Sequence, residues 1–462
     1  MSSETNQPIL KQPILKKNHL LEGSIIKSIL MIAIPVIFAN LLQTVYQLID
    51  TFWVGRLGTE AVAAVSLTFP LLFFLTSLAM GFAMAGSILV AQYNGRGDKH
   101  NVSLVTGQTL SLTIVLAIII SVLGYFSSEY LLSFLTSDSL VLSQATSYLQ
   151  ISFIAMTAMF IYNIFQSSLR GVGEVKFPTI IILITVIINF FIDPLFMYGW
   201  EFIPAMGVSG VALATLITES LAAIIGITVL IKGTYGVKVT FPDLKLRMSF
   251  VKKLLKLGTP TSLEMSSRSL GMVLMMFIVS AFGTLAIASY GIGTRMLMMV
   301  IIPAVGFSIV TSALVGNNLG ARQHQRAELI IKTAMKIAFW TLTVVGVLMF
   351  IFAEAIATFF VPNETELVLM AAQFIHIMAL TFGLIGIQMV IVGAVKAAGK
   401  TTVSMFLAMF HTVSLIVTSY LLSLGWGELG LWIAYPTANI LALGLAVYFY
   451  KRKDWLHKEL VD

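Results

Sequence analysis

The chain has 462 residues, of which 58% are hydrophobic and only 11% are charged, and its formal net charge is +7. A soluble fold of this composition would have too few polar residues to cover its surface, so a soluble globular protein is excluded. Cysteine is absent, which excludes disulfides and thiolate metal sites. We therefore expect an all-α integral membrane protein.

The first two dozen residues are polar and carry Lys11, Lys16 and Lys17. They lack the short apolar core and the small-residue cleavage site of a secretory signal. We expect residues 1–24 to form a cytoplasmic tail that stays attached to the protein.

Long apolar runs follow this tail, and a helix needs roughly 20 apolar residues to cross a bilayer. The runs and their breaks predict twelve transmembrane helices that begin near residues 25, 62, 104, 141, 176, 207, 251, 286, 328, 366, 401 and 429. The longest internal connection, residues 233–250, is polar and contains Pro242, as expected of a linker between two halves. We therefore expect two six-helix lobes, residues 25–232 and 251–450, and a C-terminal tail at residues 451–462.

Lysine and arginine are distributed unevenly over the connections. The tails and the even-numbered connections hold nearly all of them, whereas the odd-numbered connections are mostly acidic, with Arg56 almost alone on the basic side. Because basic residues collect in cytoplasmic loops, we expect a multi-pass protein of the plasma or inner membrane with both termini cytoplasmic. The basic residues are spread over many short loops and form no single patch, so nucleic acid is not an expected partner.

An internal repeat appears when the chain is aligned with itself at a shift of 225 residues. Pro35 then falls on Pro260 and Gly95 falls on Gly320, and after a slip in register Arg170-Gly171 matches Lys396-Ala397. Since each half has six spans, both halves begin on the same side of the membrane, and the repeat is parallel with its axis along the membrane normal. This arrangement predicts a central cavity between the two lobes.

Ionisable residues inside membrane segments are costly unless they face a cavity or a partner, so each one is a candidate functional residue. Asp50 follows Tyr46 by one turn and Gln43 by about two turns, so the three can share one helical face. The alternative is that Asp50 is simply solvated at the outer membrane interface, because Arg56 and a loop follow within two turns.

Asp193 is the second candidate, four residues after Asn189, a spacing that places an amide and a carboxylate on one helical face. Such oxygen donors suit a proton or a hard cation such as sodium. A helix-end cap is the alternative, since Pro194 removes a backbone donor beside it. We favour the functional interpretation because two carboxylates recur at similar depth in one lobe.

In the second half, Glu264 precedes Arg268 by four residues, a spacing that favours an ion pair. Arg295 is an alternative partner, and Glu264 could also face the central cavity; the sequence does not choose between these. As candidate functional residues, Glu219 and Glu354 are weaker, because neither has a clear polar companion on its helical face.

Motifs of enzymes are missing from the sequence. Residues 393–401 resemble a phosphate-binding loop but have five residues between the glycines where the motif has four. A His-Glu metal motif and a nucleophile elbow are absent as well. We therefore expect a protein that is not an enzyme, has no cofactor and draws its energy from an ion gradient or from a partner protein.

Several motifs together resemble one known family, the multidrug and toxic compound extrusion (MATE) transporters, and in particular its DinF-like branch. They are Ile34-Pro35, Tyr46, the run from Asp50 to Gly55, Gln92 to Gly97, Leu169 to Gly173, Asn189 to Pro194, Gly207 to Gly210 and Ala214-Thr215. The resemblance covers nearly the whole chain. It implies a twelve-helix, V-shaped antiporter that alternates between outward-open and inward-open states.

The resemblance also implies roles for individual residues. Asp50, Asn189, Asp193 and Thr215 look like the site of the coupling ion, H+ or Na+. Tyr46, Tyr148 and Gln166 would line the adjoining substrate cavity. Two further substrate-binding candidates come from the residues themselves: Gln43, which can share the helical face of Asp50, and Glu264, which could face the central cavity. A second branch of the family relies on acidic residues of segments 7 and 10, but segment 10 here offers Gln373 and His376, which favours a first-lobe mechanism.

We accordingly expect a monomer in the lipid bilayer that exports small organic compounds, cationic and amphipathic, by antiport with H+ or Na+. The alternative is an exporter or flippase of a lipid-linked or polysaccharide precursor. Twelve segments, and the lack of a dense arginine set to hold a pyrophosphate, argue against that alternative.

Overall fold

The structure is a computed structural model that describes residues 20–361, 364–456 and 460. Most of the expected N-terminal tail and part of the C-terminal tail lie outside these residues. Within them the chain is almost entirely helical. The helices are α1 (Ile25–Val54), α2 (Thr59–Gly95), α3 (Lys99–Ser133), α4 (Ser139–Gly171), α5 (Lys176–Tyr198), α6 (Val208–Lys232), α7 (Phe241–Leu244), α8 (Met248–Ser280), α9 (Thr284–Gly320), α10 (His324–Ile351), α11 (Ala353–Phe360), α12 (Thr365–Ala379), α13 (Phe382–Ala397), α14 (Thr401–Trp426) and α15 (Glu428–Lys451).

Membrane-spanning helices dominate this list. Eleven helices in the described part of the chain are long and apolar enough to cross a membrane, and the pair α12 and α13, bent by 50°, completes a twelfth span. Each span begins within about five residues of its predicted start. The prediction of an all-α membrane protein with twelve spans is confirmed.

Two helix breaks in the second half were not predicted. The short helix α11 follows α10 after Phe352, so Glu354 lies on α11 and not at the outer end of the ninth span. The tenth span is interrupted at Leu380 and Thr381, where the Thr381 hydroxyl donates to the Met378 carbonyl oxygen and accepts a hydrogen bond from Asn439. Side-chain bonds of this kind replace part of the backbone bonding that a broken membrane helix loses.

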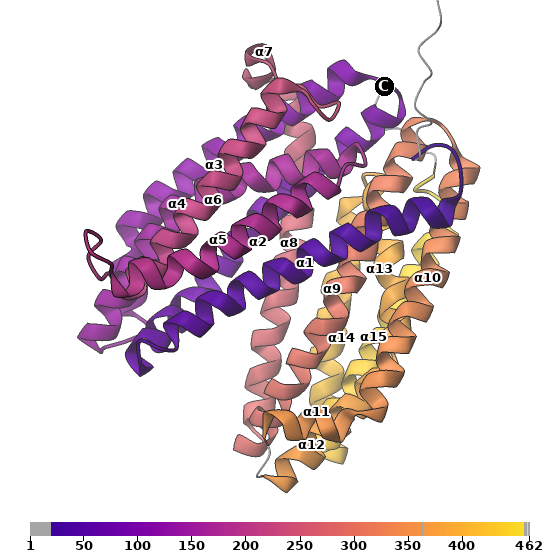
Figure 1. The fold of residues 1–462 in the computed structure, drawn as a ribbon. Coiled ribbons are helices and arrows are strands. Elements are labelled where there is room, and N and C mark those ends of the chain that lie inside the picture. The colour runs from indigo at the N-terminus through magenta and orange to yellow at the C-terminus, as the bar shows by residue number, and fades with distance from the viewer. Residues whose placement is uncertain (1–19, 362–363, 457–459, 461–462) are drawn as a thin grey trace, which may run out of the picture.

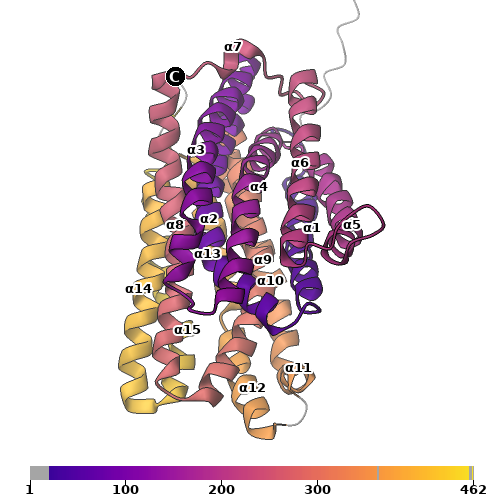
Figure 2. The same cartoon turned by 90° about the vertical axis from the view of Figure 1, so that its left-hand side faces the viewer.

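The spans form two lobes arranged as a V (Figure 1). Helices α1 to α6 make one lobe, α8 to α15 make the other, and α7 lies in the connection between them. The lobes meet at the end where α7 and the end of the described chain lie, and they diverge toward α5 on one side and α12 on the other. In the view at 90°, α7 and the C-terminal end again lie opposite α11 and α12 (Figure 2).

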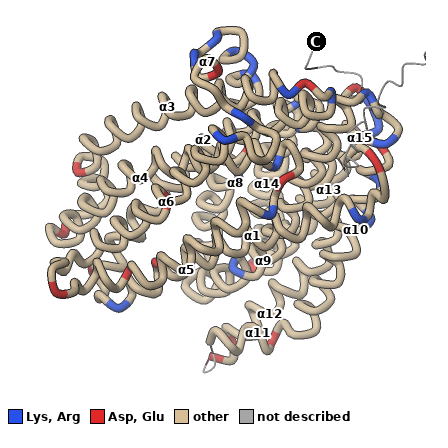
Figure 3. The backbone as a smooth tube through the Cα atoms, turned by 45° about the horizontal axis from the view of Figure 1, so that its top comes forward, with Lys and Arg blue, Asp and Glu red and all other residues tan. Residues whose placement is uncertain are grey.

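Charged residues divide between the two ends of the molecule (Figure 3). Lysine and arginine gather around α7 and the neighbouring ends of α10 and α15, while much of the acidic charge lies at the far ends of the first lobe and around α11 and α12. The lobes therefore meet at the basic end and diverge toward the acidic end.

The two lobes touch most closely where the C-terminal ends of α2 and α9 cross. A Cβ atom on Gly95 would lie 1.8 Å from the Asn317 carbonyl oxygen, and one on Gly320 would lie 1.9 Å from the Gln92 carbonyl oxygen. Gly95 and Gly320 are equivalent in the repeat, and so are Gln92 and Asn317. The same backbone-to-backbone contact is therefore made twice, once from each lobe, and it requires glycine.

Hydrogen bonds repeat this symmetry across the lobe boundary. The Gln92 side chain of the first lobe donates to the Ala397 carbonyl oxygen at 2.6 Å. Asn317 of the second lobe donates to the Gly171 carbonyl oxygen at 2.8 Å. Since Gly171 and Ala397 are also equivalent in the repeat, these two hydrogen bonds are related by the same symmetry. Together with the glycine contacts they hold the basic ends of the lobes together.

A substitution at this crossing tests its tightness. We expect Gly320→Ala to lower thermal stability in detergent, because the new methyl group must push α2 away from α9, and overpacking of this kind costs about 1–3 kcal/mol. Gly444→Ala is the matched control, since no atom lies within 4 Å of the position of its Cβ and alanine is the better helix former. Unfolding followed by tryptophan fluorescence should rank Gly320→Ala below wild type and Gly444→Ala; equal midpoints for all three would contradict the contact.

Candidate functional site

Two carboxyl groups from separate helices meet inside the first lobe. Asp193 on α5 is fully buried, as is Asn189 one turn earlier, and the Asn189 amide donates to Asp193 Oδ1 at 3.0 Å. Asp50, near the end of α1, lies close enough to Asp193 for the two carboxyl groups to interact electrostatically. The four-residue spacing on α5 thus places an amide and a carboxylate together, and α1 adds the second carboxylate.

Helix α6 completes this cluster. Thr215 Oγ1 donates to Asp50 Oδ2 at 3.5 Å, and one turn later Thr218 is hydrogen-bonded to the Tyr46 hydroxyl at 2.6 Å. Glu219 interacts electrostatically with Tyr46 and carries a buried oxygen without a partner. Glu219 was a weak candidate for the functional site because its companion, Tyr46, lies on another helix.

Besides Glu219 Oε2, three oxygens around the two aspartates lack a hydrogen-bond partner among the described residues: Asp50 Oδ1, Asn189 Oδ1 and Asp193 Oδ2. Buried polar atoms are normally paired, and two neighbouring carboxylates repel each other unless a positive charge lies between them. A proton shared by the carboxyl groups would satisfy this arrangement, as would a hard cation bound by the three oxygens. No group of three or more histidine and carboxylate side chains that could hold a metal occurs in the described chain, so a cation here would depend on amide and hydroxyl oxygens as well.

The other candidate residues of the first lobe are not all brought together. Tyr148 is buried on α4 and interacts electrostatically with both Asp50 and Asp193, so it borders the cluster. Gln43 is exposed on α1. Gln166 lines a separate small cavity with Arg170.

Glu264 has a partner that the sequence did not suggest. Its Oε1 lies 2.9 Å from Lys396 Nζ on α13, and both side chains are at most 4% exposed. The predicted partner Arg268 lies farther away, at 3.6 Å, while the Arg295 guanidinium lies over the Phe360 ring. By its sequence Lys396 falls in one of the basic, even-numbered connections, but α13 extends to Ala397 and carries Lys396 into the lobe, where it neutralises Glu264.

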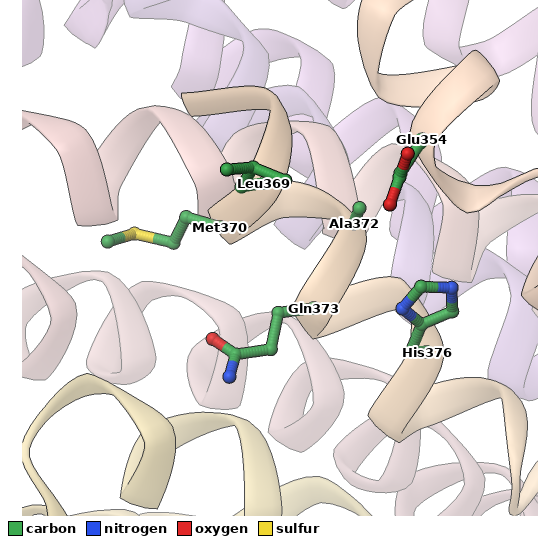
Figure 4. Close-up of a pocket in the computed structure, with 6 residues that line it drawn as sticks. All are labelled: Glu354, Leu369, Met370, Ala372, Gln373 and His376. Atoms are coloured by element: carbon green, nitrogen blue, oxygen red, sulfur yellow. The ribbon is translucent and has the colours of Figure 1, made fainter. Parts of the chain in front are cut away.

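A surface cavity of about 370 Å³ lies in the second lobe between α11 and α12. Figure 4 shows Glu354 of α11 and His376 of α12 on the same side of this cavity, with Gln373 one turn before His376. The His376 ring is hydrogen-bonded to the Phe350 carbonyl oxygen. The short helix α11 thus brings a carboxylate next to the two polar residues of segment 10.

Twelve spans in two repeated lobes, with a buried polar cluster between helices of one lobe, define a membrane transporter. The MatE family model matches residues 35–195 and 260–421, two stretches that begin 225 residues apart, which is the shift of the internal repeat. The chain belongs to this family, the MATE transporters. Its members are transporters and not enzymes, and they need no prosthetic group.

Similar proteins span the whole chain. The probable multidrug resistance protein YoeA of Bacillus subtilis (strain 168) is 29% identical over 471 residues, which cover 99% of each chain. The FAD transporter of Shewanella oneidensis is 26% identical, with 95% of this chain and 97% of that protein covered. A crystal structure of MATE in complex with MaL6 superposes with a TM-score of 0.89 at 25% identity, covering 96% of this chain and 100% of that one.

The buried pair of Glu264 and Lys396 allows a test of its energetics. We expect Lys396→Met to destabilise the protein by about 3–5 kcal/mol, because it leaves Glu264 charged, buried and without its nearest partner. The double variant Glu264→Gln, Lys396→Met should recover most of this loss, since two neutral side chains carry no desolvation penalty for charge. Midpoints of thermal unfolding in detergent are the measurement, and a double variant as unstable as the single one would show that the pair is not what stabilises this region.

Proposed function

We propose that this chain is a multidrug efflux transporter of the cell membrane that exchanges small organic compounds for H+ or Na+. The observation that carries the proposal is the buried cluster of Asp50, Asn189 and Asp193, whose unpartnered oxygens call for a positive charge that no side chain supplies. The name of the relative YoeA, a probable multidrug resistance protein, supports drug-like substrates. An acidic site favours cationic, amphipathic compounds among them.

Antiport requires that the ion and the substrate favour different conformations of the protein. In our proposal, Asp50, Asn189, Asp193 and Thr215 bind the ion, and substrate occupies the space beside Tyr46 and Tyr148. Ion binding removes the negative charge that attracts a cationic substrate and changes the packing of α1, α5 and α6. Substrate and ion then compete, because both need the same carboxylates.

Three of the predicted substrate-binding residues lie outside the cluster: Gln43, Gln166 and Glu264. Gln43 is exposed on α1, on the approach to Tyr46, and we keep it as a substrate contact. Gln166 lies in a different cavity, and Glu264 is held by Lys396. Either of these two would meet substrate only after the surrounding helices move.

We further propose that both termini are cytoplasmic and that a single chain in the bilayer is the working unit. The concentration of basic residues at the end where the lobes meet supports this orientation (Figure 3). With that orientation, the V in this structure diverges toward the outside of the cell, the side to which substrate is released.

The orientation can be tested directly because the chain contains no cysteine. Single cysteines at Ser137, between α3 and α4, and at Lys238, before α7, occupy exposed positions at opposite ends of the molecule. A membrane-impermeant maleimide applied to intact cells should label Ser137→Cys, and it should label Lys238→Cys only after permeabilisation. The reverse pattern would show that the protein is inserted the other way.

Efflux of a cationic fluorescent dye tests the role of the carboxylates. We expect Asp50→Asn and Asp193→Asn to reduce efflux to the level of cells without the transporter, because an amide cannot take up the coupling ion's charge. Glu129→Gln is the matched control, since Glu129 is an exposed carboxylate near the end of α3 and its loss should leave efflux unchanged. Thermal unfolding of each purified variant separates loss of transport from loss of fold, and full efflux by a folded Asp50→Asn variant would remove Asp50 from the mechanism.

The same cells identify the ion and the substrate class. Collapsing the proton gradient and the sodium gradient in separate experiments should stop efflux in one case only. If no cationic dye moves under either gradient, export of a lipid-linked precursor becomes the working hypothesis, and a labelled precursor in liposomes tests it. FAD belongs in the substrate panel as an anionic probe, because one relative is named as its transporter.

A further inference from the structure

Arg170 lies one residue before the end of α4, and its half-buried side chain makes no hydrogen bond or ion pair with any residue that the structure describes, although it interacts electrostatically with Tyr162. It lines a cavity of about 10 Å³ between α1, α4 and α5, large enough for about one water molecule. A guanidinium is always charged. The half-buried side chain turns this charge toward a cavity without a counter-charge, so a negative group there would be stabilised.

The rest of the cavity wall offers hydrogen-bond donors and no negative charge. Gln166 is only 8% exposed, and neither its side chain nor that of Asn40 has a partner in the described chain. Both amides can donate into the cavity. The Thr179 hydroxyl is already used, since it donates to the carbonyl oxygens of Pro35 and Val175. The remaining lining residues are apolar.

The repeat shows what fills the equivalent place in the second lobe. Lys396, one residue before the end of α13, is the equivalent of Arg170. Its partner Glu264 lies four residues after Pro260, and the residue four after the equivalent Pro35 is Ala39. Ala39 lines the cavity beside Arg170. The first lobe therefore keeps the cation of this pair and has a methyl group where the second lobe has a carboxylate.

We propose that the cavity binds a carboxylate group, which takes beside Arg170 the place that the Glu264 side chain takes beside Lys396. The Arg170 guanidinium can hold both carboxylate oxygens at once, and the Gln166 and Asn40 amides donate further hydrogen bonds. Because the cavity is small, these flexible side chains must move apart to admit the group. The carboxylate is either free in solution or part of a transported compound.

Binding can be measured without transport. Thermal unfolding of the purified full chain in detergent is followed in increasing sodium acetate, with acetamide as the neutral isostere. We expect acetate at about ten times its Kd to raise the unfolding midpoint of wild type by about 1–2 °C relative to Arg170→Gln at the same salt concentration. Acetamide should have no such effect. An unchanged midpoint, or an equal rise in Arg170→Gln, overturns the proposal.

Two reciprocal variants use the repeat as a control. Ala39→Asp supplies the missing carboxylate within the chain, and the shorter aspartate suits arginine, which is longer than lysine. We expect this variant to lose the response to acetate, and a retained response overturns the proposal. Glu264→Ala should do the opposite: it vacates the place beside Lys396, and acetate should stabilise it more than wild type. An equal response of Glu264→Ala and wild type overturns the equivalence from which the proposal starts.

The source of the carboxylate is decided by a transport experiment, the one arm that rests on the proposed function. Cells export either a dye that bears one carboxylate and one positive charge or the methyl ester of that dye. Preference for the carboxylate form, lost in Arg170→Gln with ester efflux intact, assigns the site to substrate. Equal efflux of both forms together with the acetate response assigns it to a free anion. If neither dye is exported, the proposed function is wrong. The acetate experiment in detergent still decides, independently of transport, whether the cavity binds a carboxylate.

Discussion

The bilayer provides no water to solvate a charge, so every charged group inside a lobe needs a partner from the protein or from outside it. The chain meets this constraint in two ways. Glu264 and Lys396 neutralise each other at 2.9 Å and are both buried, and Arg268 lies 3.6 Å from the same carboxylate oxygen. Asp50 and Asp193 interact electrostatically, and each has one oxygen without a hydrogen-bond partner in the described chain. Arg170 faces a cavity with no carboxylate in its wall. At the positions where the protein leaves a charge unbalanced, an ion or ligand of opposite charge gains the most binding free energy.

The contacts that join the lobes lie directly beside the two cations. Gly171, which accepts a hydrogen bond from Asn317, follows Arg170, and Ala397, which accepts one from Gln92, follows Lys396. A change in how α2 and α9 cross would therefore displace the ends of α4 and α13 and the cations that they carry. A single peptide unit thus lies between the cavity beside Arg170 and the contact that joins the lobes. In the proposed transport cycle, a change in how the lobes pack at the basic end would reach Arg170 through this peptide.

Hydrophobicity, loop charge and the repeat were enough to predict the fold, since the bilayer allows few architectures for twelve apolar runs. The helix break at Leu380 and Thr381 could not be predicted, because no proline or glycine occupies those two positions and the compensating donor, Asn439, lies 58 residues away. The spacing of Asn189 and Asp193 on one helix predicted their contact. The partner of Glu264 could not be found in this way: Lys396 is 132 residues distant and reads as a loop residue. The repeat held a usable signal, because it aligned Lys396 with Arg170 and Glu264 with Ala39, but the spatial contact was needed to recognise that these positions form a pair.

The two lobes thus share one helix plan and differ in their charge. In the second lobe, the cation near the end of the fourth span is neutralised by the first span of the same lobe, so its electrostatic state does not depend on what is bound. In the first lobe the equivalent pair is broken at Ala39, and a separate pair of carboxylates lies on α1 and α5. Both unbalanced sites involve α1, which also contacts α9 and α10 of the other lobe. Binding of an ion near one end of α1 and of an anionic group near its middle would act on the same helix and on the same lobe boundary. Coupling between the two ligands would then need no long pathway, because one helix contributes to both sites.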